Sequence, residues 1–73
     1  MDPKVVFKNA LNFDATAIIL AHNHPSGKLT PSVSDKILTK KIKEAGEVLD
    51  INLLDHLIIT DKEYFSFADK FML

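Results

Sequence analysis

Two kinds of hydrophobic pattern alternate along the chain, and the first of them predicts a helix near the start. In residues 3–12 the apolar positions recur at helical spacing, as at Val6 and Ala10. Asp2 followed by a proline is typical of a helix start, because the aspartate caps free N–H groups and proline fits the first turn. We therefore predict a helix over residues 3–12.

A short run that is apolar throughout, TAIILA at residues 16–21, comes next. Its length and its β-branched residues favour a strand, and the lack of alternation is typical of a strand buried on both faces. The loop that follows, residues 23–33, contains two prolines and a glycine, so we predict that it is irregular.

Helical spacing returns after this loop and continues to about residue 49. The apolar stripe of this second helix comprises Leu38, Ile42, Ala45 and Leu49. Either Ser32 or Ser34 can cap its first turn. Gly46 weakens the helix without ending it, because glycine costs helical stability but does not remove a hydrogen bond.

Two further strands complete the predicted fold, which is of the α/β class. Residues 51–60 form an apolar run interrupted by Asp55 and His56, residues 64–67 alternate, and the tail is either a last helical turn or frayed. The order α-β-α-β-β predicts a small mixed sheet packed against two helices. A right-handed crossover makes the first two strands parallel, and the third returns antiparallel. One sheet edge should be open to a neighbour, such as a second copy of the chain.

Composition narrows the classes of function. The 73 residues make one small domain or part of one, and a chain of this size buries only about 60% of its unfolded surface. Without cysteine, histidine and carboxylate are the strong metal ligands left, and nothing suggests secretion. No signal peptide or membrane-spanning run is evident, which favours a cytoplasmic protein. The net charge of −1, without any arginine, argues against direct nucleic-acid binding by this chain.

Chemically reactive residues gather where the first strand meets its loop. In an extended strand, side chains two residues apart share a face, so His22 and His24 would point the same way. Asp35 begins the next helix, and the crossover should bring it to the edge of the sheet where ligands bind in open α/β folds. Two imidazoles and a carboxylate suit Zn²⁺ and leave a fourth position for water, whose pKa zinc lowers to about 7. The alternative is a polar loop whose side chains only satisfy backbone groups.

These residues also carry a resemblance to a known family. HNHPSG, followed by seven residues and Asp35, resembles the JAMM (MPN-domain) metalloprotease motif of His-x-His-Pro, a spacer and Asp. The form AHNHPSG…PS…D is most similar to the bacterial RadC branch. The segments DPKVVFKNAL and KKIKEAGEVLDINLLDHLIIT…YFSFAD are RadC-like as well, so the similarity covers essentially the whole chain.

The resemblance implies a truncated MPN-like domain with His22, His24 and Asp35 as zinc ligands. It also implies that Ser32 supports a developing oxyanion, which a hydroxyl can do by donating to a carbonyl oxygen. The alternative role for Ser32 is a plain helix N-cap. The implied reaction is attack of a zinc-activated water on a peptide or isopeptide carbonyl of an unidentified peptide or protein substrate.

The chain departs from the family pattern in its general base. Family members place a glutamate on an upstream strand, whereas no glutamate precedes Glu44 here, and Glu47 and Glu63 do not match that position either. We expect residues 1–73 to be a single partial domain without the family's N-terminal strands, either a fragment or a natural short form. Zinc binding survives this loss in principle, whereas general-base catalysis does not.

Other interpretations stay open at this point. The domain could be a non-catalytic, metal-binding interaction module associated with DNA repair or recombination, as the RadC name suggests. A non-haem iron oxygenase also uses two histidines and a carboxylate, but the ligand order fits it poorly. His56 is either a hydrogen-bonded core histidine or a residue that supports the ligands. Phe65 and Phe67 are expected to pack in the core.

Overall fold

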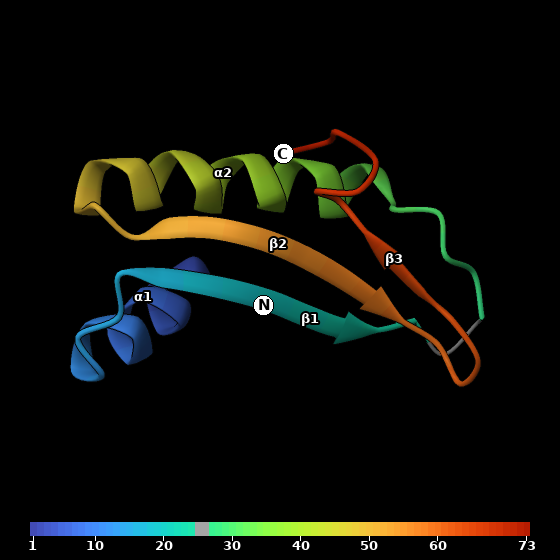
Figure 1. The fold of residues 1–73 in the computed structure, drawn as a ribbon, viewed down its shortest axis with the longest axis horizontal. Helices are drawn as coiled ribbons and strands as arrows, with labels where there is room; N and C mark the ends of the chain where they lie inside the picture. The colour runs from blue at the N-terminus through green and yellow to red at the C-terminus, as the bar shows by residue number, and fades with distance from the viewer. Residues whose placement is uncertain (25–26) are drawn as a thin grey trace.

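Two helices and a three-stranded sheet follow one another in the predicted order (Figure 1). The computed structural model describes residues 1–24 and 27–73. The elements are α1 (Pro3–Asn12), β1 (Ala17–Asn23), α2 (Val33–Leu49), β2 (Asn52–Ile59) and β3 (Tyr64–Ser66). Residues 25 and 26 of the predicted irregular loop fall outside the described residues.

The sheet has the order β1-β2-β3, with β1 and β2 parallel and β2 and β3 antiparallel. This confirms the predicted mixed sheet and its crossover through α2. The register between β1 and β2 shifts once, between Ile18 and Ile19, and from there Leu20 lies opposite His56. The shift matters for function, because it sets which residues of β2 share a face with the histidines of β1.

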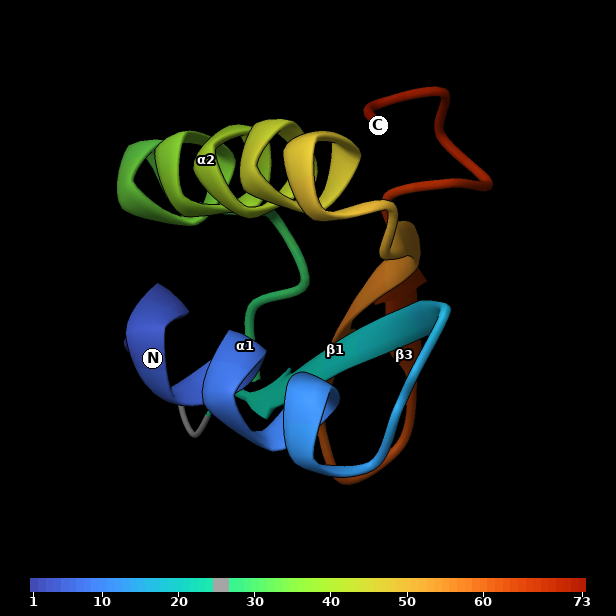
Figure 2. The ribbon, with the colours of Figure 1, turned by 90° about the vertical axis from the view of Figure 1, so that its left-hand side faces the viewer.

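Both helices lie on the same side of the sheet, as the view along the strands shows (Figure 2). Leu20, which faces them, is 6% exposed, whereas Ile19 on the opposite face is 59% exposed. The prediction that the first strand is buried on both faces is therefore wrong for the described part of the chain. The run is apolar on both faces, but the helices described here cover only one of them.

The core lies between that covered face and the two helices. Its buried members are Phe7, Ala10, Leu20, Ile42, Ile51 and Leu53, which come from α1, β1, α2 and β2 and the residue before β2. Asp2 caps α1 as predicted, with its carboxylate accepting from the Lys4 N–H at 2.9 Å. Neither helix in the described ranges is long and apolar enough to cross a membrane.

Gly46 explains how α2 passes into β2. The helix continues through it and ends at the C-cap Asp50, which has a left-handed backbone with φ of 58°. A Cβ atom on Gly46 would lie 2.2 Å from the carbonyl oxygen of Ile51. Glycine therefore allows the chain to return close against the helix, and the Ile51 N–H donates to the Gly46 carbonyl at 2.8 Å.

The chain after β2 differs in detail from the prediction. The strand β3 ends at Ser66, one residue earlier than expected, while Phe67 is buried as predicted. The tail forms a series of turns, one of which is closed by a hydrogen bond from the Lys70 N–H to the Ser66 carbonyl. Of the two predictions for the tail, the helical turn is therefore closer to the structure than the frayed end.

Candidate metal centre

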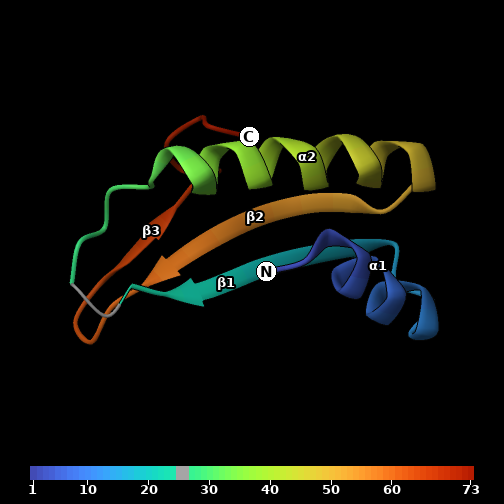
Figure 3. The same cartoon turned by 180° about the vertical axis from the view of Figure 1, so that it is seen from behind.

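The carboxyl ends of β1 and β2 and the start of α2 meet at one end of the sheet (Figure 3). His22 lies in β1 and projects toward the helices, as Leu20 does two residues earlier. His24 follows the strand and extends its pairing, since its N–H donates to the Ile59 carbonyl at 3.0 Å. Asp35 is the third residue of α2. The crossover thus brings together the three residues that the sequence predicted.

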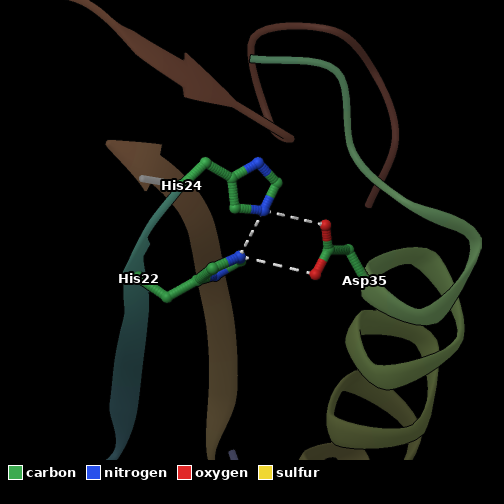
Figure 4. Close-up of side chains that lie close together, drawn as sticks. All are labelled: His22, His24 and Asp35. Atoms are coloured by element: carbon green, nitrogen blue, oxygen red, sulfur yellow. Dashed lines mark hydrogen bonds and ion pairs between the residues drawn. The ribbon is translucent and has the colours of Figure 1, made fainter. Parts of the chain in front are cut away.

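The polar atoms of these side chains converge on one point (Figure 4). The two Nε2 atoms of His22 and His24 lie 3.0 Å apart, and they are 3.4 Å and 3.2 Å from Oδ1 and Oδ2 of Asp35, respectively. Two ligands bound to one zinc ion at 2.0–2.1 Å with a tetrahedral angle lie about 3.3–3.4 Å apart. The spacing is therefore close to that of a zinc coordination shell, and the group could hold a metal ion.

The other ring nitrogen of His24 shows that its Nε2 is free to act as a ligand. Nδ1 of His24 lies 2.9 Å from the carbonyl oxygen of Lys28. A carbonyl can only accept, so this Nδ1 carries a proton and the Nε2 of the neutral ring presents its lone pair. Metal-binding histidines commonly donate their second N–H in this way.

At 3.0 Å the two Nε2 atoms are close enough for one to donate a proton to the other or for both to bind one metal ion. Two nitrogen lone pairs at 3.0 Å repel each other unless a proton or a metal ion lies between them. Two imidazole nitrogens and a carboxylate oxygen form a donor set that zinc accepts well. The residues present therefore fit a zinc ion by both distance and donor type.

Asp35 is held in place by the start of its own helix. Ser32 is the N-cap, its Oγ accepting from the Asp35 N–H at 3.0 Å, while Asp35 Oδ2 accepts from the Ser32 N–H at 2.8 Å. Burial raises the pKa of Asp35, but the polar groups of Ser32 and the nearby His22 and His24 outweigh this and hold the pKa below its ordinary value. The capping box thus keeps a charged carboxylate directed at the two histidines.

For Ser32, the N-cap interpretation is confirmed and the oxyanion interpretation stays a prediction. Its Oγ accepts from the Asp35 N–H, and that bond leaves the hydroxyl proton uncommitted. The residue is exposed and stands three positions before a candidate ligand.

His56 proves to be both a core histidine and a neighbour of a candidate ligand. It is fully buried, its Nε2 lies 2.9 Å from Nδ1 of His22, and its ring stacks on Phe67 with centroids 4.8 Å apart. The pKa of His56 is lowered mainly by burial and, to a smaller extent, by electrostatic repulsion from His22. The ring is therefore neutral at ordinary pH.

Thr39 is the polar neighbour that the sequence analysis missed. It is buried in α2, and its Oγ1 lies 2.6 Å from Nδ1 of His56. A signal was present, because Thr39 follows Asp35 by four residues and so lies one helical turn beyond it, beside the apolar stripe.

Comparison with known proteins agrees with the site. The family model described as RadC-like JAB domain matches residues 1–72 of the chain. The chain belongs to the RadC-like JAB domain family. This confirms the predicted resemblance, and the small α/β architecture is consistent with such a domain.

Relatives of this RadC-like domain occur in several bacteria. A UPF0758 protein of Flavobacterium johnsoniae is 59% identical over 70 residues, which is 96% of this chain and 31% of the relative. A UPF0758 protein of Thermotoga maritima is 44% identical over 68 residues, 93% of this chain and 31% of the relative. The UPF0758 protein YkfG of Escherichia coli is 48% identical over 71 residues, 97% of this chain and 45% of the relative. The chain therefore spans less than half the length of each of them.

Proposed function

We propose that this RadC-like domain supplies the zinc ligands of a JAMM-type metallohydrolase that cleaves peptide or isopeptide bonds. The observation that carries the proposal is the convergence of His22, His24 and Asp35, whose ligand atoms all lie within 4.8 Å of one another. When bound by three protein ligands, zinc keeps a position for water and lowers the pKa of that water to about 7, which provides a nucleophile at neutral pH.

The surrounding residues have distinct roles in this proposal. The negative charge of Asp35 would offset part of the positive charge of the metal ion. The capping box keeps the carboxylate in position. Ser32 would donate its hydroxyl proton to the carbonyl oxygen of the substrate as negative charge grows there. A groove of about 590 Å³ between the end of β1 and the β2–β3 turn reaches His24 and offers a path for an extended substrate.

The general base is the part of this mechanism that we do not assign to residues 1–73. Glu44 and Glu47 lie along α2, on a groove whose lining combines lysines of that helix with Phe67, Met72 and Leu73. The metal-ligating group found among the described residues contains no glutamate. We therefore propose that this chain binds zinc but hydrolyses its substrate only in the context of a longer chain with an upstream glutamate. A cytoplasmic location, an unidentified protein substrate and self-association through the sheet edge stay predictions.

Two measurements test this function. The purified chain should bind one zinc ion, and the His24→Ala variant should bind none. A longer RadC-like chain that includes the upstream segment should cleave peptide or isopeptide libraries, and replacement of its upstream glutamate by glutamine should abolish cleavage. A zinc-loaded longer chain that cleaves no such bond would refute the hydrolase proposal and favour a non-catalytic interaction module.

A further inference from the structure

A line of hydrogen bonds runs behind the candidate metal centre and joins two of its ligands. Nδ1 of His22 lies 2.9 Å from Nε2 of His56, and Nδ1 of His56 lies 2.6 Å from Oγ1 of Thr39. The Thr39 hydroxyl donates to the main-chain carbonyl of Asp35 at 2.7 Å. These hydrogen bonds therefore connect His22 in β1, through His56 in β2 and Thr39 in α2, to the main chain of Asp35.

The direction of every bond in this line follows from its last member. The Asp35 carbonyl can only accept, so the single proton of the Thr39 hydroxyl is committed to it. Oγ1 of Thr39 must then accept from Nδ1–H of His56. A neutral His56 with its proton on Nδ1 has a lone pair on Nε2, which accepts from Nδ1–H of His22.

The consequence for His22 is a single tautomer. With its proton on Nδ1, the neutral His22 ring presents the Nε2 lone pair to His24 and Asp35, which is the form that a metal ion needs. We propose that His56 and Thr39 are positioning residues, which fix the tautomer and ring orientation of His22 and tie that ring to the helix that carries Asp35. This inference rests on the proposed zinc site, but it concerns groups that do not touch the metal.

The burial of the two residues supports this role. His56 is 0% exposed and Thr39 is 2% exposed, so neither can replace a lost partner with bulk water. Phe67 stacks on His56 with an angle of 9° between the rings and holds the imidazole plane in place. A polar pair buried in the core between two ligands keeps its geometry because each bond satisfies a group that would otherwise stay unpaired.

Substitutions at Thr39 separate positioning from packing. Thr39→Val keeps the side-chain volume but removes the hydroxyl, whereas Thr39→Ser keeps the hydroxyl but removes a methyl group. A positioning role predicts that T39V lowers zinc affinity by about 10- to 100-fold, in line with other residues that orient metal-binding histidines. It also predicts that T39S stays close to the unchanged chain. If only packing matters, T39S should lose at least as much affinity as T39V, which would overturn the inference.

A second readout needs no metal. In the metal-free chain, ¹⁵N NMR of the imidazoles should show a proton on Nδ1 of His22, whether or not a second proton lies between the two Nε2 atoms. The T39V chain should lose this preference, and T39S should keep it. An unchanged His22 tautomer in T39V would refute the proposal. If T39V does not fold by circular dichroism, Thr39→Ala replaces it, since T39A and T39S differ by the hydroxyl alone.

The two readouts keep the inference separate from the proposed function. Zinc affinity is measured by competition with a chromophoric chelator, using zinc alone as the probe. If the unchanged chain binds no zinc, the proposed function fails, while the tautomer of metal-free His22 still decides the positioning role. If zinc binds equally well to the unchanged chain, T39S and T39V, the metal site stands and the positioning role is refuted.

Discussion

Replacing Asp55 by asparagine tests how the last strand is fastened behind the candidate site. Oδ1 of Asp55 accepts two backbone N–H groups, from His56 at 2.7 Å and from Ala68 at 3.0 Å. Oδ2 accepts the hydroxyl of Ser66 at 2.5 Å. One carboxylate thus joins β2 to the end of β3 and to the turn that follows Phe67, the residue that stacks on His56.

The expected cost of Asp55→Asn follows from these three bonds. The amide oxygen can take the place of Oδ1 and keep both backbone bonds, although without the strength that a charged acceptor gives them. The amide NH₂ would meet the Ser66 hydroxyl, which must turn its proton away and also accepts from the Asp69 N–H at 3.1 Å. Bonds to charged groups contribute about 1.5–3 kcal/mol and neutral ones about 1 kcal/mol, so we expect a net loss of about 1–2 kcal/mol in the free energy of unfolding.

The loss in free energy of unfolding caused by Asp55→Asn should become smaller at low pH. Burial raises the pKa of Asp55, but the bonds from Ser66, Ala68 and His56 outweigh it and hold the folded-state pKa below the ordinary value of 3.8. A depressed pKa means that the stabilisation is present above the unfolded-state pKa and is lost as pH falls through the folded-state pKa. The difference between the unchanged chain and D55N should therefore be constant near neutral pH and shrink below about pH 4.

Urea unfolding followed by circular dichroism at a series of pH values measures this difference. Asp61→Asn, in the exposed turn between β2 and β3, is the matched control and should stay within about 0.5 kcal/mol of the unchanged chain, as surface substitutions usually do. The reasoning is refuted if D55N unfolds at the same urea concentration as the unchanged chain, or if its deficit grows as the pH falls.

Three further predictions concern the helix and the metal. In an exposed helix, Gly46→Ala would raise the free energy of unfolding by about 1 kcal/mol. Here the new Cβ would lie 2.2 Å from the Ile51 carbonyl oxygen, so urea unfolding should show that the free energy of unfolding falls by about 1–3 kcal/mol. A more stable G46A chain would contradict this. Ser32→Ala should cost about 1 kcal/mol as a lost N-cap. Ser32→Asp should recover that stability in urea but not hydrolysis by a longer chain, since a carboxylate cannot donate; full activity of S32D would exclude the oxyanion role. Free zinc at 100 times its Kd should raise the free energy of unfolding by about 2.7 kcal/mol, and this gain should vanish in His24→Ala.

The order of elements and the ligand set could be predicted because both depend on local pattern and topology. Helical spacing, a continuous apolar run and a capping serine predict α1, β1 and the start of α2 without long-range information. A right-handed crossover then places the start of α2 beside the end of β1, so Asp35 comes near His22 and His24. That His22 and His24 point the same way also follows without tertiary information, because side chains two residues apart share one face of an extended strand.

The exposed face of β1 could not be predicted, because it depends on what covers the sheet. Ile19 is as apolar as Leu20, and the sequence pattern of the strand does not distinguish them. The contacts from His22 through His56 to Thr39 could not be predicted as a whole, although His56 was a candidate support for the ligands and Thr39 lies one helical turn beyond Asp35. They require the register shift between β1 and β2 and the facing turn of α2, which are both tertiary features.

X-ray absorption spectroscopy of the zinc-loaded chain tests the central claim most directly, because it reports the atoms bound to the metal. The claim predicts a first shell of nitrogen and oxygen at about 2.0–2.1 Å, with the outer-shell scattering of two imidazole rings. In the His24→Ala chain, one imidazole should disappear from the spectrum, or zinc should be lost on dialysis. A spectrum without imidazole scattering, or one that His24→Ala leaves unchanged, would contradict the assignment of His22, His24 and Asp35 as the metal ligands.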